Sequence, residues 1–226
     1  MNKSFFILSV IILLSSCNKD NEYSYAIKDF RKSLQPYLFK IVSEGIVMYT
    51  DSALKNMATD DELIRLGRSE HPVLRASAFR EMLERKSFDQ HKLISGHLND
   101  TAMVLSDRGE FGTAYRMVTD DILLSTFWTS RETRHKIIEK IIREHNYLTA
   151  AYTILDNLEP QENLYPFIKD MATRSRRLSY EGYELGFDDI EYALYGLAKF
   201  KRKDDVGIIR KVLMENYATS AMYRSN

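Results

Sequence analysis

The stretch from Glu62 to Arg85, ELIRLGRSEHPVLRASAFREMLER, decides the expected fold of this chain. It predicts a helix, a polar turn between Gly67 and Pro72, and a second helix, because proline fits the first turn of a helix. The second helix has one apolar face, formed by Val73, Ala76, Phe79, Met82 and Leu83. Arg80 falls on the other side of that helix, and we expect it to face solvent.

The first of these helices has a recognisable start. Thr59 stands three residues before Glu62, so each side chain can bond the other residue's backbone N–H group in a capping box. Leu63, Ile64 and Leu66 follow as its apolar residues. A short helix therefore begins just after Thr59.

Helical spacing continues on both sides of this stretch. Apolar residues from Ala26 to Ile46 form a stripe, and Pro36 within it either starts a new helix or kinks the first. Thr113 is typical of a helix start and precedes apolar residues that continue through Ile122. Because the chain has only four prolines and nine glycines, we predict an all-α fold of about ten short helices.

The helix pairs suggest a repeat. The segment Val73-Leu74-Arg75-Ala76-Ser77-Ala78 opens the second helix, and Lys92–Leu123 and Ile190–Leu213 are weaker copies of the pair, the former with a long insertion through Gly109 and Gly112. The Glu62–Arg85 stretch resembles a HEAT repeat. The resemblance implies an α-α superhelix, a solenoid of stacked helix pairs over residues 25–226. An irregular helical bundle is the alternative.

The N-terminus is typical of an export signal. A short start with Lys3 precedes the apolar run Phe5–Leu14, which is shorter than the about 20 residues that span a bilayer. Leu14-Ser15-Ser16-Cys17 then resembles the lipobox of bacterial lipoproteins. The resemblance implies that residues 1–16 are removed, that Cys17 is acylated, and that residues 17–24 form a lipidated tether. A free thiol behind an ordinary signal peptide, or a retained apolar anchor, would be the alternatives.

Composition limits the classes of partner. The chain has 32 basic and 32 acidic residues, so its net charge gives no reason to expect nucleic-acid binding. Cys17 is the only cysteine, which excludes an intramolecular disulfide and a cysteine-based metal site. Asn18 stands where some bacteria use aspartate to retain lipoproteins in the inner membrane. We therefore expect a lipid-anchored envelope protein of the outer membrane, on its periplasmic face or at the cell surface.

The sequence offers little for catalysis. Glu132 and His135 have the Glu-x-x-His spacing of a di-iron bundle, but the chain has no second copy of that motif. His91 and His97 lie six residues apart, on nearly opposite sides of a helix, so they cannot share a metal. Motifs for a serine nucleophile or a phosphate-binding loop are also missing. We expect no catalytic centre, no cofactor and no metal.

The segment between the two basic runs near residues 174–177 and 199–203 has the composition of a protein interface, which favours tyrosine and arginine. It contains Tyr180, Tyr183, Tyr192 and Tyr195. The candidate binding surface consists of Arg176, Arg177, Tyr180, Tyr183, Lys201 and Lys203. Two structural interpretations compete with binding: the cations, with Arg174 and Lys199, can complement helix C-termini, and some tyrosines can belong to the core.

The function expected from the sequence is protein binding or scaffolding at a membrane, by a lipid-anchored module that is not an enzyme. A solenoid suits this task because it offers an extended surface. A small envelope enzyme whose site forms only in three dimensions is one alternative. A binder of acidic glycans or lipid headgroups, acting through the basic runs, is another.

Overall fold

A computed structural model describes residues 26–48, 52–107, 112–125, 131–174 and 187–224. The predicted signal peptide and tether, with Cys17, lie outside the described residues. The chain divides into two compact units. The first comprises the residues up to Asp89 together with Asp100–Ile122, and the second comprises Gln90–Asn99 together with the residues from Leu123 onward.

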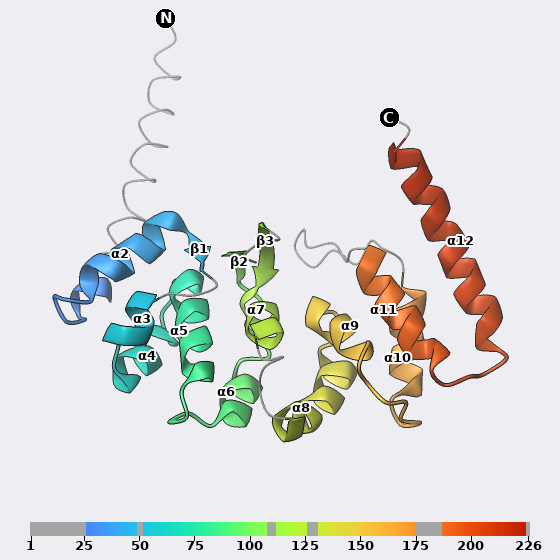
Figure 1. The fold of residues 1–226 in the computed structure, drawn as a ribbon, viewed down its shortest axis with the longest axis horizontal. Coiled ribbons are helices and arrows are strands. Elements are labelled where there is room, and N and C mark those ends of the chain that lie inside the picture. The colour runs from blue at the N-terminus through green and yellow to red at the C-terminus, as the bar shows by residue number, and fades with distance from the viewer. Residues whose placement is uncertain (1–25, 49–51, 108–111, 126–130, 175–186, 225–226) are drawn as a thin grey trace, which may run out of the picture. The chain divides into compact units, whose positions relative to one another are not determined.

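Helices make up most of both units (Figure 1). The helices are α2 (Gln35–Glu44), α3 (Ser52–Met57), α4 (Asp60–Leu66), α5 (Pro72–Glu84), α6 (Gln90–Gly96), α7 (Val118–Ser125), α8 (Arg131–Glu144), α9 (Thr149–Leu155), α10 (Tyr165–Thr173), α11 (Phe187–Ala198) and α12 (Asp205–Arg224). The strands are β1 (Ile46–Val47), β2 (Met103–Asp107) and β3 (Thr113–Met117).

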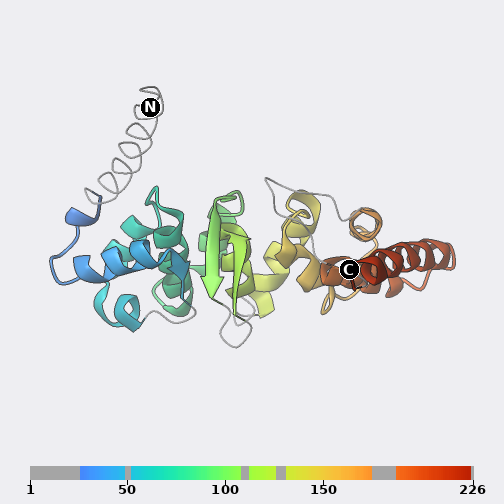
Figure 2. The ribbon, with the colours of Figure 1, turned by 90° about the horizontal axis from the view of Figure 1, so that it is seen from above.

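The expected all-α solenoid is wrong, because the first unit contains a three-stranded mixed sheet packed among helices. Strand β2 lies in the middle, parallel to β1 and antiparallel to β3, with Leu105 opposite both Ile46 and Tyr115. Figure 2 shows β2 and β3 side by side. The fold is therefore α/β with a small sheet, and it is not a HEAT-like superhelix.

The sheet lies where the sequence predicted helix and insertion. Thr113 begins β3, and the helix expected from Thr113 starts only at Val118. Along β2 the side chains alternate between half-buried and buried positions, the pattern of a strand with one face in the core. Gly45, at a φ of 66°, ends α2 in the left-handed conformation. Ile46, expected on the helical stripe, therefore enters β1.

The helix pair predicted over Glu62–Arg85 is present. Helices α4 and α5 pack against each other, and Pro72 lies in the first turn of α5 as predicted. The capping box is also confirmed: Thr59 Oγ1 accepts from the Glu62 N–H group, and the Glu62 carboxylate accepts from the Thr59 N–H group at 2.9 Å. Pro36 starts a new helix, α2.

Helix α5 forms the centre of the first unit. It contacts α2, α3, α4, β1 and β2, and nine of its thirteen residues are buried. Phe79 is only 1% exposed, so the predicted core face is confirmed. A helix surrounded by so many elements has little outward surface, and this is why the prediction for Arg80 fails.

Arg80 belongs to a buried polar cluster with Ser106 and Asp121. Its guanidinium donates to the Asp121 carboxylate, with Nε at 2.8 Å from Oδ2, and to Ser106 Oγ at 2.8 Å. Ser106 in turn donates to Asp121 at 2.7 Å, and Arg80 also donates to the Met48 carbonyl at 2.7 Å. The cluster joins α5 to β2, to α7 and to the residue that follows β1.

The second unit is helical in its described residues. Helix α8 contacts α6, α9 and α10, and helix α11 contacts α9, α10 and α12. Among the residues that the structure describes, no helix is both long enough and apolar enough to cross a membrane.

Candidate binding groove

Helix α11 is held in the second unit by its inner face. Ile190, Ala193 and Leu197 are buried on that face, against α9 and α10. Gly196 permits the close approach, because a Cβ atom added there would lie 3.1 Å from Leu155 Cβ. This contact fixes which side of α11 turns outward.

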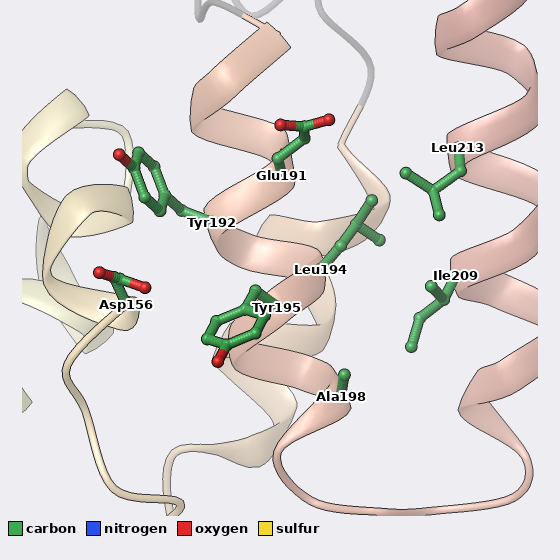
Figure 3. A pocket seen from close by; sticks show the side chains of 8 residues that line it. All are labelled: Asp156, Glu191, Tyr192, Leu194, Tyr195, Ala198, Ile209 and Leu213. Atoms are coloured by element: carbon green, nitrogen blue, oxygen red, sulfur yellow. The ribbon is translucent and has the colours of Figure 1, made fainter.

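The outer side of α11 borders an open groove of about 510 Å³. Four lining residues of α11, Glu191, Leu194, Tyr195 and Ala198, are spaced i, i+3, i+4 and i+7, so they form one stripe along the helix. The remaining lining residues are Tyr192 from α11, Asp156 after α9, and Ile209 and Leu213 from α12. In Figure 3, Leu194 points toward Ile209 and Leu213, whereas the two tyrosines lie on the side of Asp156.

A buried carboxylate fixes the start of α12, which carries one wall of the groove. Asp205 is 1% exposed and accepts from Tyr165 Oη at 2.8 Å and from Lys169 Nζ at 3.0 Å. The hydrogen bonds to Tyr165 and Asp205 raise the pKa of Lys169, which keeps its ammonium charged. The first turn of α12 is thereby tied to α10.

The preceding turn adds a second tie. Arg202 forms an ion pair with Glu162, and its guanidinium lies 3.6 Å from the centre of the Tyr165 ring. This distance is within the range of a cation–π interaction. Together with Asp205, Arg202 holds the α11–α12 turn against the beginning of α10.

The ammonium group of Lys199, beside the groove, donates hydrogen bonds to backbone carbonyls of the second unit. Lys199 Nζ donates to the carbonyls of Leu155 at 3.0 Å and Leu158 at 3.2 Å, and also to the Asp156 carbonyl. These carbonyls lie at and beyond the C-terminal end of α9, where a cation complements the helix dipole. The structural interpretation of Lys199 is therefore supported, although the helix it serves is α9.

The groove has a negative rim. Asp156 is exposed and Glu191 is half-buried. Neither carboxylate forms an ion pair with another residue that the structure describes. The groove thus combines apolar walls, two tyrosine rings and two carboxylates.

The surface predicted from the sequence only borders this groove. Lys201 and Lys203 are exposed in the turn between α11 and α12, and neither lines the groove. Arg176, Arg177, Tyr180 and Tyr183 lie outside the described residues. Arg174 donates to the Asn146 carbonyl at 2.9 Å and pairs with Asp170, which agrees with a structural role.

The residues that sequence reasoning missed are the apolar ones on α12 and the stripe on α11. A signal was present, because the segment from Ile190 to Ala198 is apolar or aromatic on nearly all sides, more than one buried face requires. Tyr192 and Tyr195 were noted in the sequence and do line the groove.

Metal chemistry finds no support among the residues described. No group of three or more His, Cys, Asp or Glu side chains there could hold a metal ion. Glu132 and His135 both belong to α8, but their side chains lie outside the description.

No protein family, curated protein or solved structure matches this chain. Within its described residues the chain is a mostly helical protein with a small mixed sheet and an aromatic groove along α11.

Proposed function

We propose that this protein is a lipid-anchored module of the bacterial envelope that binds a protein partner in the groove along α11. The observation that carries the proposal is the stripe of α11 that lines the groove, where the exposed Tyr195 lies beside the buried Leu194 and an apolar wall from α12. Tyr195 is 57% exposed. An exposed tyrosine beside an apolar concave surface is typical of the residues that dominate binding energy in protein interfaces.

The rigidity of the site supports the same function. Gly196 seats α11 on α9, and Asp205 ties α12 to α10. A preformed groove loses little conformational freedom on binding, so more of the contact energy becomes affinity.

The charges favour a protein over acidic ligands. Asp156 and Glu191 line the same groove as the tyrosines, and their carboxylates would repel an acidic glycan or an anionic headgroup at this position. In this proposal Cys17 supplies the lipid anchor, and the polar residues after it separate the helical units from the membrane. The lipidation itself rests on the resemblance of Leu14–Cys17 to a lipobox.

Site-specific photocrosslinking in intact cells tests the proposal. A photoreactive phenylalanine analogue replaces Tyr195, and in a matched control it replaces Tyr37, an exposed tyrosine of α2. We expect a defined crosslinked protein from position 195 that is absent from position 37. Leu213→Lys should abolish this product, because it places a charge in the apolar wall.

Two results would overturn the proposal. One is the absence of any protein crosslink at position 195. The other is a pattern of products that is the same at both positions, or that persists unchanged in the Leu213→Lys protein.

A further inference from the structure

We infer that the segment bound in the groove is a basic amphipathic helix of the partner protein, with its lysines or arginines placed against Asp156 and Glu191. This inference rests on the proposed function and names the chemistry of the partner. Three features of the groove lead to it: the helical spacing of its lining residues, the hydrogen bonding of its backbone groups and its acidic side chains.

The spacing of the side chains that line the groove suits a bound helix. Its lining follows α11 at i, i+3, i+4 and i+7, and Ile209 and Leu213 repeat on α12 at i and i+4. The grooves between side chains with this spacing accept the side-chain ridges of a third helix. Helix α11 spans twelve residues, about 18 Å at the rise of an α-helix, so about three turns of a partner can lie along it.

The backbone of the groove excludes the main alternative, an extended peptide held by main-chain bonds. The lining residues of α11 and α12 lie within helices, where N–H and C=O groups already bond one another. An extended segment would find few main-chain partners on such a surface. A helix satisfies its own backbone groups and needs only side-chain contacts, which is how amphipathic helices bind apolar grooves.

The charge of the rim determines the charge of the partner. Asp156 and Glu191 have no cationic partner among the described residues, and the Lys199 ammonium is engaged by three carbonyls. In Figure 3, Asp156 lies on the side of Tyr192, and Glu191 lies beside Tyr192 in the sequence of α11. Lys199 Nζ already lies 5.1 Å from the centre of the Tyr195 ring. A lysine or arginine at the edge of the bound helix could therefore pair with a carboxylate and also lie over the Tyr192 ring.

Binding of two designed peptides to the full mature chain in detergent tests the inference. Both peptides have about 16 residues, enough for marginal helicity, with leucines at i, i+3, i+4 and i+7. One carries lysines beside the leucine stripe, and the other carries glutamates at the same positions. Fluorescence anisotropy should show the lysine peptide binding at least about tenfold more tightly at low salt, with the difference shrinking as salt screens the rim.

Variants assign the effect to the rim. The double change Asp156→Asn and Glu191→Gln should reduce the discrimination between the peptides to about twofold or less, since the attraction is removed. Glu159→Gln, which alters an exposed carboxylate outside the groove, should leave the discrimination unchanged. Thermal melts of the same samples establish that each variant is folded.

The outcomes separate this inference from the proposed function. Equal binding of both peptides, weakened in both cases by Leu213→Ala, would overturn the basic helix but leave the groove as a docking site. Failure of both peptides, or lysine-peptide binding that the double variant does not change, would also overturn the inference. The proposed function fails separately, through the crosslinking at Tyr195.

Discussion

Asp121 carries a carboxylate whose side chain is fully shielded from solvent, and Arg80 supplies the charge that compensates it. Two contacts from Arg80 and one from Ser106 reach that carboxylate. A buried pair of this kind adds little to stability compared with an apolar replacement, but removal of one partner leaves a charge that cannot be solvated.

We therefore expect Arg80→Ala to lower the free energy of unfolding by about 3 to 5 kcal/mol, the range for breaking a buried pair. The control is Lys40→Ala, which removes an exposed pair with Glu44 and should cost under about 0.5 kcal/mol. Urea denaturation measures both. Similar losses for the two variants would mean that Asp121 does not depend on Arg80.

Glu62 should make stability depend on pH. The hydrogen bond from Arg31, opposed by burial and helped by Thr59, lowers the pKa of Glu62 from 4.5 to about 2. Because the folded state holds the carboxylate ionised, its contribution is fully present above about pH 4.5 and is lost as the pH falls toward 2. Glu62→Gln should thus cost about 1.5 kcal/mol at pH 7, the low end of the range for a hydrogen bond to a charged group because Arg31 is half exposed, and much less near pH 2.

Chemical denaturation of wild type and Glu62→Gln across this range measures the difference. Glu84→Gln serves as the control, since Glu84 pairs with Lys55 in the open, and it should cost under about 0.5 kcal/mol at pH 7. A difference between wild type and Glu62→Gln that stays constant from pH 7 to pH 2 would contradict the assignment.

At the scale of the element, the packing of α11 on α9 depends on a missing side chain. A Cβ at Gly196 would lie 3.1 Å from Leu155 Cβ, whereas one at Gly207 in α12 would meet nothing within 4 Å. Gly196→Val should therefore destabilise the protein by about 1 to 3 kcal/mol, as overpacking does. Gly207→Val should change stability by under about 0.5 kcal/mol, the usual range for an exposed site.

Urea denaturation of the two valine variants measures the contrast, and affinity for the lysine peptide gives a second readout. If Gly196→Val proves as stable as Gly207→Val, then α11 can move away from α9 without cost, and the groove is less rigid than the packing indicates.

The elements that could be predicted from the sequence were those with local signals. Thr59, Glu62 and Pro72 mark where α4 and α5 begin, by chemistry that acts within one turn. The strands had no such marker. Met103–Asp107 gains its identity from pairing, with the neighbouring β3 on one side and with β1, which is distant in sequence, on the other. Thr113, which is as typical of a strand as of a helix start, was assigned to the wrong class.

At the scale of the whole molecule, the sequence indicated the part of the chain that carries the groove, but not the set of residues that line it. Tyr192 and Tyr195 were recognised as interface-like residues. Of the cations beside them that the structure describes, Lys201 and Lys203 do not line the groove, and Lys199 donates to carbonyls. Whether Lys199 faces a ligand or the end of α9 depends on tertiary packing, and no spacing rule reports it.

The proposed membrane anchor can be tested directly. The lipobox resemblance predicts that Cys17 receives the fatty acid, so Cys17→Ser should leave the protein without acyl label and unprocessed. Metabolic labelling with a fatty acid, followed by separation by mass, measures both effects. Equal label in the variant and the wild type would show that the anchor lies elsewhere.

The route of the chain between its two units also governs the order in which it can fold. The chain passes from one unit to the other three times, because Gln90–Asn99 belongs with the residues after Leu123. Helix α6 packs on α8, so as the polypeptide emerges N-terminus first, α6 lacks its main packing partner until α8 follows. A nascent chain stopped between these helices would expose the apolar side of α6, including Ile94, and holding chaperones should bind it most strongly at that length.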